Sequence, residues 1–146
     1  MKKPLQLRDF LLASVKELQA NPEKLQIFID SGNLHQRLQT DKLHFEYEYN
    51  LNLIVTDFSV HTDLVLVPLL AWLKAAQPEI APDAIKFEAD VIDHSRIDLS
   101  LTIPLSERVI VTQGEDGNYQ TDHPAEPVPD YNLPDPAALQ DLIVNE

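Results

Sequence analysis

A long alternation of apolar and polar residues between Leu43 and Val55 constrains the fold more than any other feature of this 146-residue chain. Successive side chains of a strand point to opposite faces, so the pattern predicts a strand with one buried and one solvated face, as in an antiparallel sheet. The run is long for a strand, and we therefore expect a bend or bulge within it. The apolar positions are Leu43, Phe45, Tyr47, Tyr49, Leu51, Leu53 and Val55.

Two segments have the periodicity of helices that would cover such a sheet. Apolar residues recur at helical spacing from Leu7 to Leu18, and this spacing predicts a helix over 5–20 that ends before Pro22. A second helix is predicted over 64–77, and it tolerates Pro68 only if that residue lies in or near the first turn. This helix is apolar on nearly all sides, so we expect one side to face the core and another to face a partner.

Shorter apolar runs predict the remaining strands, over residues 25–30, 85–92, 97–103 and 108–111. Turns are expected at 31–33, 93–95 and 104–106, where Gly, Pro, Asp, Asn and Ser gather. A chain of this length has room for a single hydrophobic core. The predicted fold is a single α+β domain of order α-β-β-α-β-β-β, in which two helices cover a mainly antiparallel or mixed sheet of about five strands.

The composition changes sharply after Gln113. Residues 114–146 contain no Lys or Arg, are rich in Pro, and carry eight of the 24 acidic residues of the chain. We expect a folded domain over 1–113 followed by an extended acidic arm over 114–146. Leu139, Leu142 and Ile143 would share one helical face at its end, as in an arm that binds a partner. The alternative is a frayed tail that touches only its own domain.

Residue types give little support for catalysis. The chain has no Cys, its three Gly do not form a phosphate-binding loop, and its five His lack the spacing of a helical zinc site. Asp90, Asp93 and His94 are the sharpest candidate for a metal-dependent hydrolase, but Asp-rich turns are common for structural reasons. We therefore predict no enzyme activity, no catalytic or metal-binding residue and no cofactor.

Charge and apolar surface point to protein partners instead. The net charge of −13 disfavours direct binding to nucleic acid or to an anionic membrane, and the apolar run of the second helix is too short to span a bilayer. The start of the chain does not read as a signal peptide, so we expect cytoplasmic synthesis. Pro68 and Trp72 are candidate contact residues in the second helix, and the alternative for Trp72 is that it fills the core. An acidic inhibitor of a basic protein is the alternative that the charge suggests.

Several short segments, in order, resemble the phage tail completion protein R family. The resemblance covers roughly residues 5–113 and leaves the acidic tail outside it. The segments are Leu25–Gly32, Phe45–Tyr47, Val55–Phe58, Val67–Leu73, Phe87–Asp90, Ile97–Leu99 and Glu107–Val111.

The resemblance implies a minor structural protein of temperate contractile-tailed phages, needed to complete the tail so that it joins a filled head. It brings no catalytic residues. Its expected partners are the end of the tail tube or sheath and the head–tail connector, and its expected locations are the host cytoplasm during assembly and then the virion tail. Stopping a polymerising tube calls for a homo-oligomeric ring, and the sixfold symmetry usual in such tails makes a hexamer the expected state.

Overall fold

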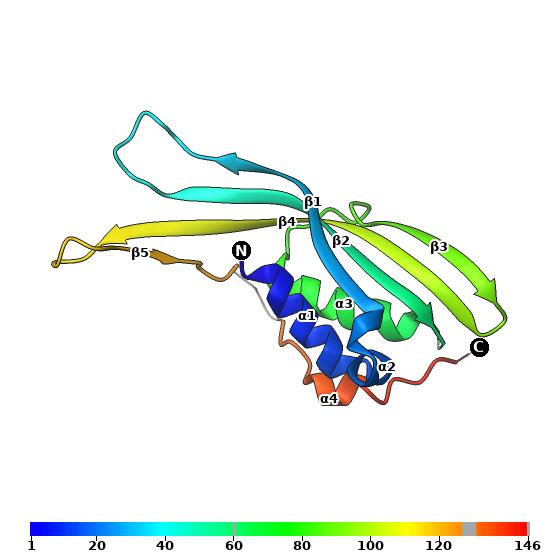
Figure 1. The fold of residues 1–146 in the computed structure, drawn as a ribbon. Coiled ribbons are helices and arrows are strands. Elements are labelled where there is room, and N and C mark those ends of the chain that lie inside the picture. Colours follow the sequence, from blue (N-terminus) through cyan, green and yellow to red (C-terminus); the bar gives the residue numbers. More distant parts are fainter. Residues whose placement is uncertain (60, 127–130, 146) are drawn as a thin grey trace.

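The computed structural model describes residues 1–59, 61–126 and 131–145. Its central element is a five-stranded antiparallel sheet, with the helices on one face (Figure 1). The strands run in the order β1-β2-β4-β3, and β5 pairs with the far end of β4. The strands are β1 Leu25–His35, β2 Phe45–Phe58, β3 Lys86–Asp93, β4 Arg96–Gln113 and β5 Tyr119–Asp122. The α+β class and the number of strands predicted from the sequence are confirmed.

Strand β2 contains the predicted alternation of apolar and polar residues. Its inner face, the face toward the helices, buries Tyr49, Leu51, Leu53 and Val55. The expected irregularity lies at the end of the strand, where the register with β4 shifts between Val55 and Phe58. The intervening Asp57 has a φ of 52°, a left-handed conformation that fits a bulge.

The turns predicted at 31–33 and 104–106 are wrong. β1 continues through Gly32 with a bulge between Ile29 and Ser31, and β4 runs unbroken through Pro104, which lies opposite Asn50. Between Thr102 and Ile110 β4 is paired only with β2, and the free edge there tolerates a residue without an N–H. The inward positions on both sides of Pro104 remain apolar, so burial outweighed the local turn signal.

The helices are α1 Lys3–Ser14, α2 Lys16–Ala20, α3 Asp63–Ala76 and α4 Pro136–Leu139, with a 3-10 turn at Pro22–Lys24. The single helix predicted over 5–20 is interrupted at Val15, which has extended φ and ψ of −116° and 109°. Both pieces still bury their apolar side chains in one core with α3 and the sheet. No helix in the described part of the chain is long and apolar enough to cross a membrane.

The segment after Gln113 contacts the rest of the fold at several places, which include the Lys3–Glu126 ion pair and the contact of Lys74 with the ring of Tyr131. Residues 119–122 form β5, antiparallel to β4, and α4 packs against α1. The side-chain amide of Gln140 donates a 2.6 Å hydrogen bond to the carbonyl of Ala13. Residues 127–130 and 146 of the predicted arm lie outside the described residues. The division of the chain at Gln113 stays a prediction.

Candidate assembly surface

The apolar inner face of the sheet extends beyond the helices that cover it. On β3, Phe87, Ala89 and Val91 lie opposite inward-facing residues of β4, yet Phe87 is 69% exposed and Val91 is 76% exposed. We call these three residues the β3 strip. β3 is also the last strand on its side of the sheet, so its outer backbone edge has no strand partner among the described residues.

Helix α3 adds exposed apolar residues, but not the ones that the sequence suggested. Pro68 and Trp72 are buried in the core, whereas Val67 and Leu70 are 39% and 48% exposed. Pro68 is the sixth residue of α3, beyond its first turn, and its side chain is buried. The role of Pro68 and Trp72 in contacts with other subunits stays a prediction. Both side chains are buried within the subunit, so such a contact would require them to become accessible.

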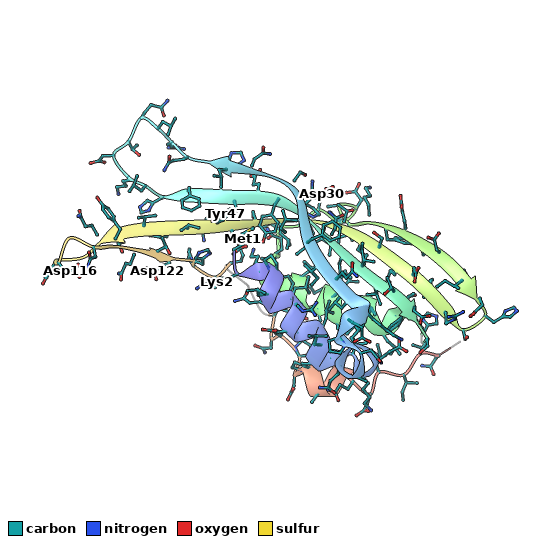
Figure 2. The ribbon with its side chains drawn as sticks, in the orientation of Figure 1. Met1, Lys2, Asp30, Tyr47, Asp116 and Asp122 are labelled. Atoms are coloured by element: carbon teal, nitrogen blue, oxygen red, sulfur yellow. The ribbon has the colours of Figure 1, made fainter. Side chains whose placement is uncertain are left out.

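Two hairpins project past the helices and form the elongated end of the molecule (Figure 1). The β1–β2 arm comprises residues 31–49, and the β4–β5 arm comprises residues 106–122. Pairing of Phe45 with Val109 holds the arms side by side. Figure 2 shows Tyr47 on the first arm and Asp116 at the tip of the second, with Met1 and Lys2 at their base.

The inner face of the arms is apolar although no helix covers it. Leu34 lies opposite Tyr47, and Tyr119 lies opposite Gln113, with Leu34 and Tyr119 both largely exposed. The rings of Phe45 and Tyr47 meet edge to face, with their centroids 5.2 Å apart. An alternation of this kind is typical of a sheet with a covered face, yet Leu34 and Tyr119 remain exposed on this one.

A buried polar cluster anchors the arms to the body. The carboxylate of Glu107 accepts hydrogen bonds from the Tyr49 hydroxyl at 2.5 Å and from the backbone N–H of Lys2 at 2.7 Å. The ammonium group of Lys3 donates to the carbonyl of Ser106 at 2.6 Å and to the side-chain oxygen of Gln77 at 2.8 Å. The N-terminal residues and the end of α3 therefore meet β4 along the stretch where its second edge has no strand.

Burial and hydrogen bonding shift the pKa values in this cluster in opposite directions. Burial raises the pKa of Tyr49 well above its usual range, and the bond to Glu107 raises it further. Burial also opposes ionisation of Glu107, but hydrogen bonds from Tyr49, Lys2 and Lys3 together hold its pKa below the usual value. Burial lowers the pKa of Lys3 despite the nearby carboxylates of Glu126 and Glu107. Glu107 is thus a buried anion that depends on its donors.

A basic hollow of about 600 Å³ lies at the tip of the β1–β2 arm, between the 36–44 loop and β4. Arg37, Lys42 and Arg108 line it together with one carboxylate, Glu46, which lies directly opposite Arg108 across the β2–β4 pair. None of the three cations forms an ion pair in the part of the chain that the structure describes. Two His also line it, but His35 pairs with Glu48 and His44 accepts the N–H of Val111. Sequence reasoning missed this site because Arg108 is remote in the chain from the loop that carries Arg37 and Lys42.

Of the candidate hydrolase residues, Asp93 and His94 lie at the β3–β4 turn, whereas Asp90 lies on the strand β3. Asp93 accepts hydrogen bonds from Arg96 and from Ser95, and these bonds lower the pKa of Asp93 to about 2. Asp90 lies on the solvated face of β3, directly opposite Asp98. Among residues 1–59, 61–126 and 131–145, no three acidic or imidazole side chains gather in a way that would hold a metal ion.

The predicted C-terminal contact residues differ in exposure. Leu139, on α4, is half-buried and packs against the core. Leu142 is also half-buried, whereas Ile143 is 78% exposed. Lys16 on α2 pairs with Asp141 at 2.9 Å, so the end of the chain lies along α1 and α2. The role of these residues in subunit contacts stays a prediction.

Comparisons with known proteins point to one family. A family model described as P2 phage tail completion protein R (GpR) matches residues 1–127. The tail completion protein R of Escherichia phage P2 is 38% identical over 145 aligned residues, which cover 95% of this chain and 92% of that protein. No solved structure matches the chain.

Proposed function

We propose that this chain, which belongs to the P2 phage tail completion protein R (GpR) family and has a structural role in the phage tail, completes the tail by capping its end. The capped tail can then join the head. Capping requires a subunit that binds the end of a growing tube and presents a different surface on its other side. The observation that carries this proposal is the uncovered apolar face of the sheet, which is displayed at two separate places on one folded body.

We propose a closed homo-oligomeric ring as the form of the cap, with a hexamer as the expected state. A monomer that exposes several large apolar side chains along an edge strand carries an aggregation hazard unless another subunit covers it. A ring removes that hazard because each subunit covers its neighbour, and it matches the rotational symmetry of a tube. The exposed residues Val67, Leu70 and Ile143 are further candidates for these contacts.

The chain works with other tail proteins, and we propose the end of the tail tube or sheath and the head–tail connector as its partners. The acidic segment 114–146 suits a basic surface on one of them. The final location of the chain is the virion tail. We propose that the tail is assembled in the host cytoplasm before that.

We propose that the activity is assembly alone, without catalysis. Glu107, the buried carboxylate with a strongly constrained environment, is surrounded by backbone and side-chain donors of its own fold. Asp93, the exposed one, is held by Arg96. Each of these carboxylates has a structural use that accounts for its position.

Electron microscopy of lysates from a phage that lacks this gene tests the proposal. Headless tails or abnormally long tails are expected, and supply of the intact chain from a plasmid should restore joined particles. Normal tails joined to heads in its absence would overturn the capping role. For the ring, native mass measurement of the purified chain should give a particle about six times its 16.5 kDa mass, and imaging should show closed rings.

A further inference from the structure

We propose that the tip of the β1–β2 arm of one subunit covers the β3 strip of a second copy of this chain. The inference deepens the ring proposal and rests on it, because it names the two surfaces that meet. We define the arm tip as Leu34, Leu38 and Leu43 together with Arg37 and Lys42.

The β3 strip needs a cover that is apolar on one side and basic on the other. Phe87 and Val91 expose most of their side chains on the inner face. On the outer face of the same strand, Asp90 lies directly opposite Asp98 across the β3–β4 pair, and like charges at such positions repel. Glu88 adds a third carboxylate on that face and Lys86 adds one cation, so the face remains net negative. Neither Glu88 nor Asp90 forms an ion pair among the described residues.

The arm tip supplies both properties. Leu38 is 82% exposed, and Leu34 and Leu43 are also largely exposed. Arg37 and Lys42 form no ion pair in the described chain, and they outnumber the one carboxylate of the loop, Asp41, in a protein whose net charge is −13. The two patches are complementary in charge and in polarity. One has unpaired cations beside exposed leucines, and the other has unpaired carboxylates beside an exposed apolar strand.

The positions of the two patches make the contact head to tail. The arms extend from one end of the sheet, and the tip of β3 with its turn to β4 lies at the opposite end (Figure 1). An arm therefore does not reach the β3 strip of its own chain. A contact between two different surfaces of identical subunits propagates by a fixed rotation, and a rotation that closes produces a ring.

A charge swap tests the pairing. In Arg37→Glu/Lys42→Glu the arm tip becomes acidic, and in Glu88→Lys/Asp90→Lys the strand becomes basic. We expect each double variant to weaken self-association by about tenfold or more, and the chain with all four substitutions to recover within about threefold of the original. All four residues are exposed, so folding should be preserved, and circular dichroism with thermal unfolding checks this.

A disulfide cross-link gives an independent measurement. The chain has no Cys, so Leu38→Cys/Val91→Cys carries one engineered thiol on each patch. Mild oxidation of the assembled protein should give covalent ladders of dimers and higher oligomers that collapse on reduction. Leu38→Cys/Leu5→Cys, which places the second thiol at an exposed position of α1, is the matched control and should cross-link much less.

The outcomes separate this inference from the tail-capping role. Rings that form without this cross-link, or a fourfold variant that remains as weak as the double variants, would show that other surfaces join the subunits. A chain that stays monomeric at every concentration and yields no cross-link would also overturn the contact. In each of these cases, the capping role is tested separately, by asking whether the intact chain restores joined particles in the phage that lacks the gene.

Discussion

The phenolic hydroxyl of Tyr49 on β2 donates a 2.5 Å hydrogen bond to Glu107 on β4, across a diagonal of the sheet, because the residue directly opposite Tyr49 is Leu105. Glu107 lies where the body ends and the β4–β5 arm begins, and its second oxygen accepts the N–H of Lys2. One buried carboxylate thus joins two strands and the N-terminus at the root of the arms. Several consequences of this arrangement are measurable.

Removal of the hydroxyl in Tyr49→Phe should lower the free energy of unfolding by about 2 kcal/mol, because a hydrogen bond to a charged group is lost and the buried carboxylate keeps its desolvation cost. Urea denaturation measures the change. Tyr47→Phe is the matched control, since it lies two residues away on the same face and its ring packs against Phe45. It should change stability by less than about 0.5 kcal/mol. Equal losses in both variants would contradict the role assigned to the Tyr49 hydroxyl.

Acid should remove part of the stability that Glu107 provides. The pKa of Glu107 is lower in the folded protein than its usual value, so its contribution is present above the pKa of the unfolded state and is lost as the pH falls through the folded value. The stability difference between the wild type and Tyr49→Phe should therefore be constant near neutral pH and shrink below about pH 4.5. Urea midpoints between pH 3 and 7 check this, and a difference that grows in acid would contradict it.

Alkali should act on Tyr49 with the opposite sign. Burial, followed by the bond to Glu107, raises the pKa of Tyr49 in the folded state, so this residue ionises freely only after unfolding. Its contribution to stability is present below the unfolded pKa of about 10 and is lost as the pH rises above that value. In ultraviolet titration at 295 nm, the tyrosinate signal that appears only with unfolding should be smaller in Tyr49→Phe than in Tyr47→Phe.

Gly32 is expected to be intolerant of a side chain. An added Cβ would lie 3.0 Å from the carbonyl oxygen of Glu48 and 3.1 Å from Cβ of Tyr49, and both belong to the paired strand β2. Gly32→Ala should therefore destabilise the protein by about 1–3 kcal/mol and increase amide exchange in the β1–β2 arm. Gly114→Ala is the control, because its closest contact is the movable side chain of Asp116. If Gly32→Ala left the free energy of unfolding unchanged, the arm would be able to shift away from the body without loss of stability.

Two residues near the C-terminus should behave differently in the isolated subunit. Leu139 packs against the core beside α1, whereas Ile143 is exposed. Leu139→Ala should reduce stability by about 1 kcal/mol, since the burial of a half-buried leucine side chain is lost, and Ile143→Ala should have almost no effect. Thermal unfolding at low protein concentration measures both. A large loss for Ile143→Ala would indicate that its contacts are made within the subunit.

The parts of the fold that follow from local pattern were predictable. The alternation through Leu51 and Leu53 predicted a half-buried strand, and the helical spacing of Leu7 and Leu11 predicted a covering helix. The turn signals at Gly32 and Pro104 misled, because local turn chemistry is worth less than a continuous buried face on either side of it. The basic hollow was not predictable, since only strand pairing brings Arg108 beside the loop that carries Arg37 and Lys42.

The sequence by itself determined the class of fold, the direction in which each strand turns its apolar side chains, and the family of the chain, because periodicity and residue order are local properties of the polymer. The tertiary structure decided which of those apolar side chains are covered. Trp72 and Phe87 are both aromatic residues in apolar patterns, yet one is buried in the core and the other is exposed on an edge strand. Burial depends on how far the helices extend over the sheet, and that distance is set by packing between segments that are remote in the chain.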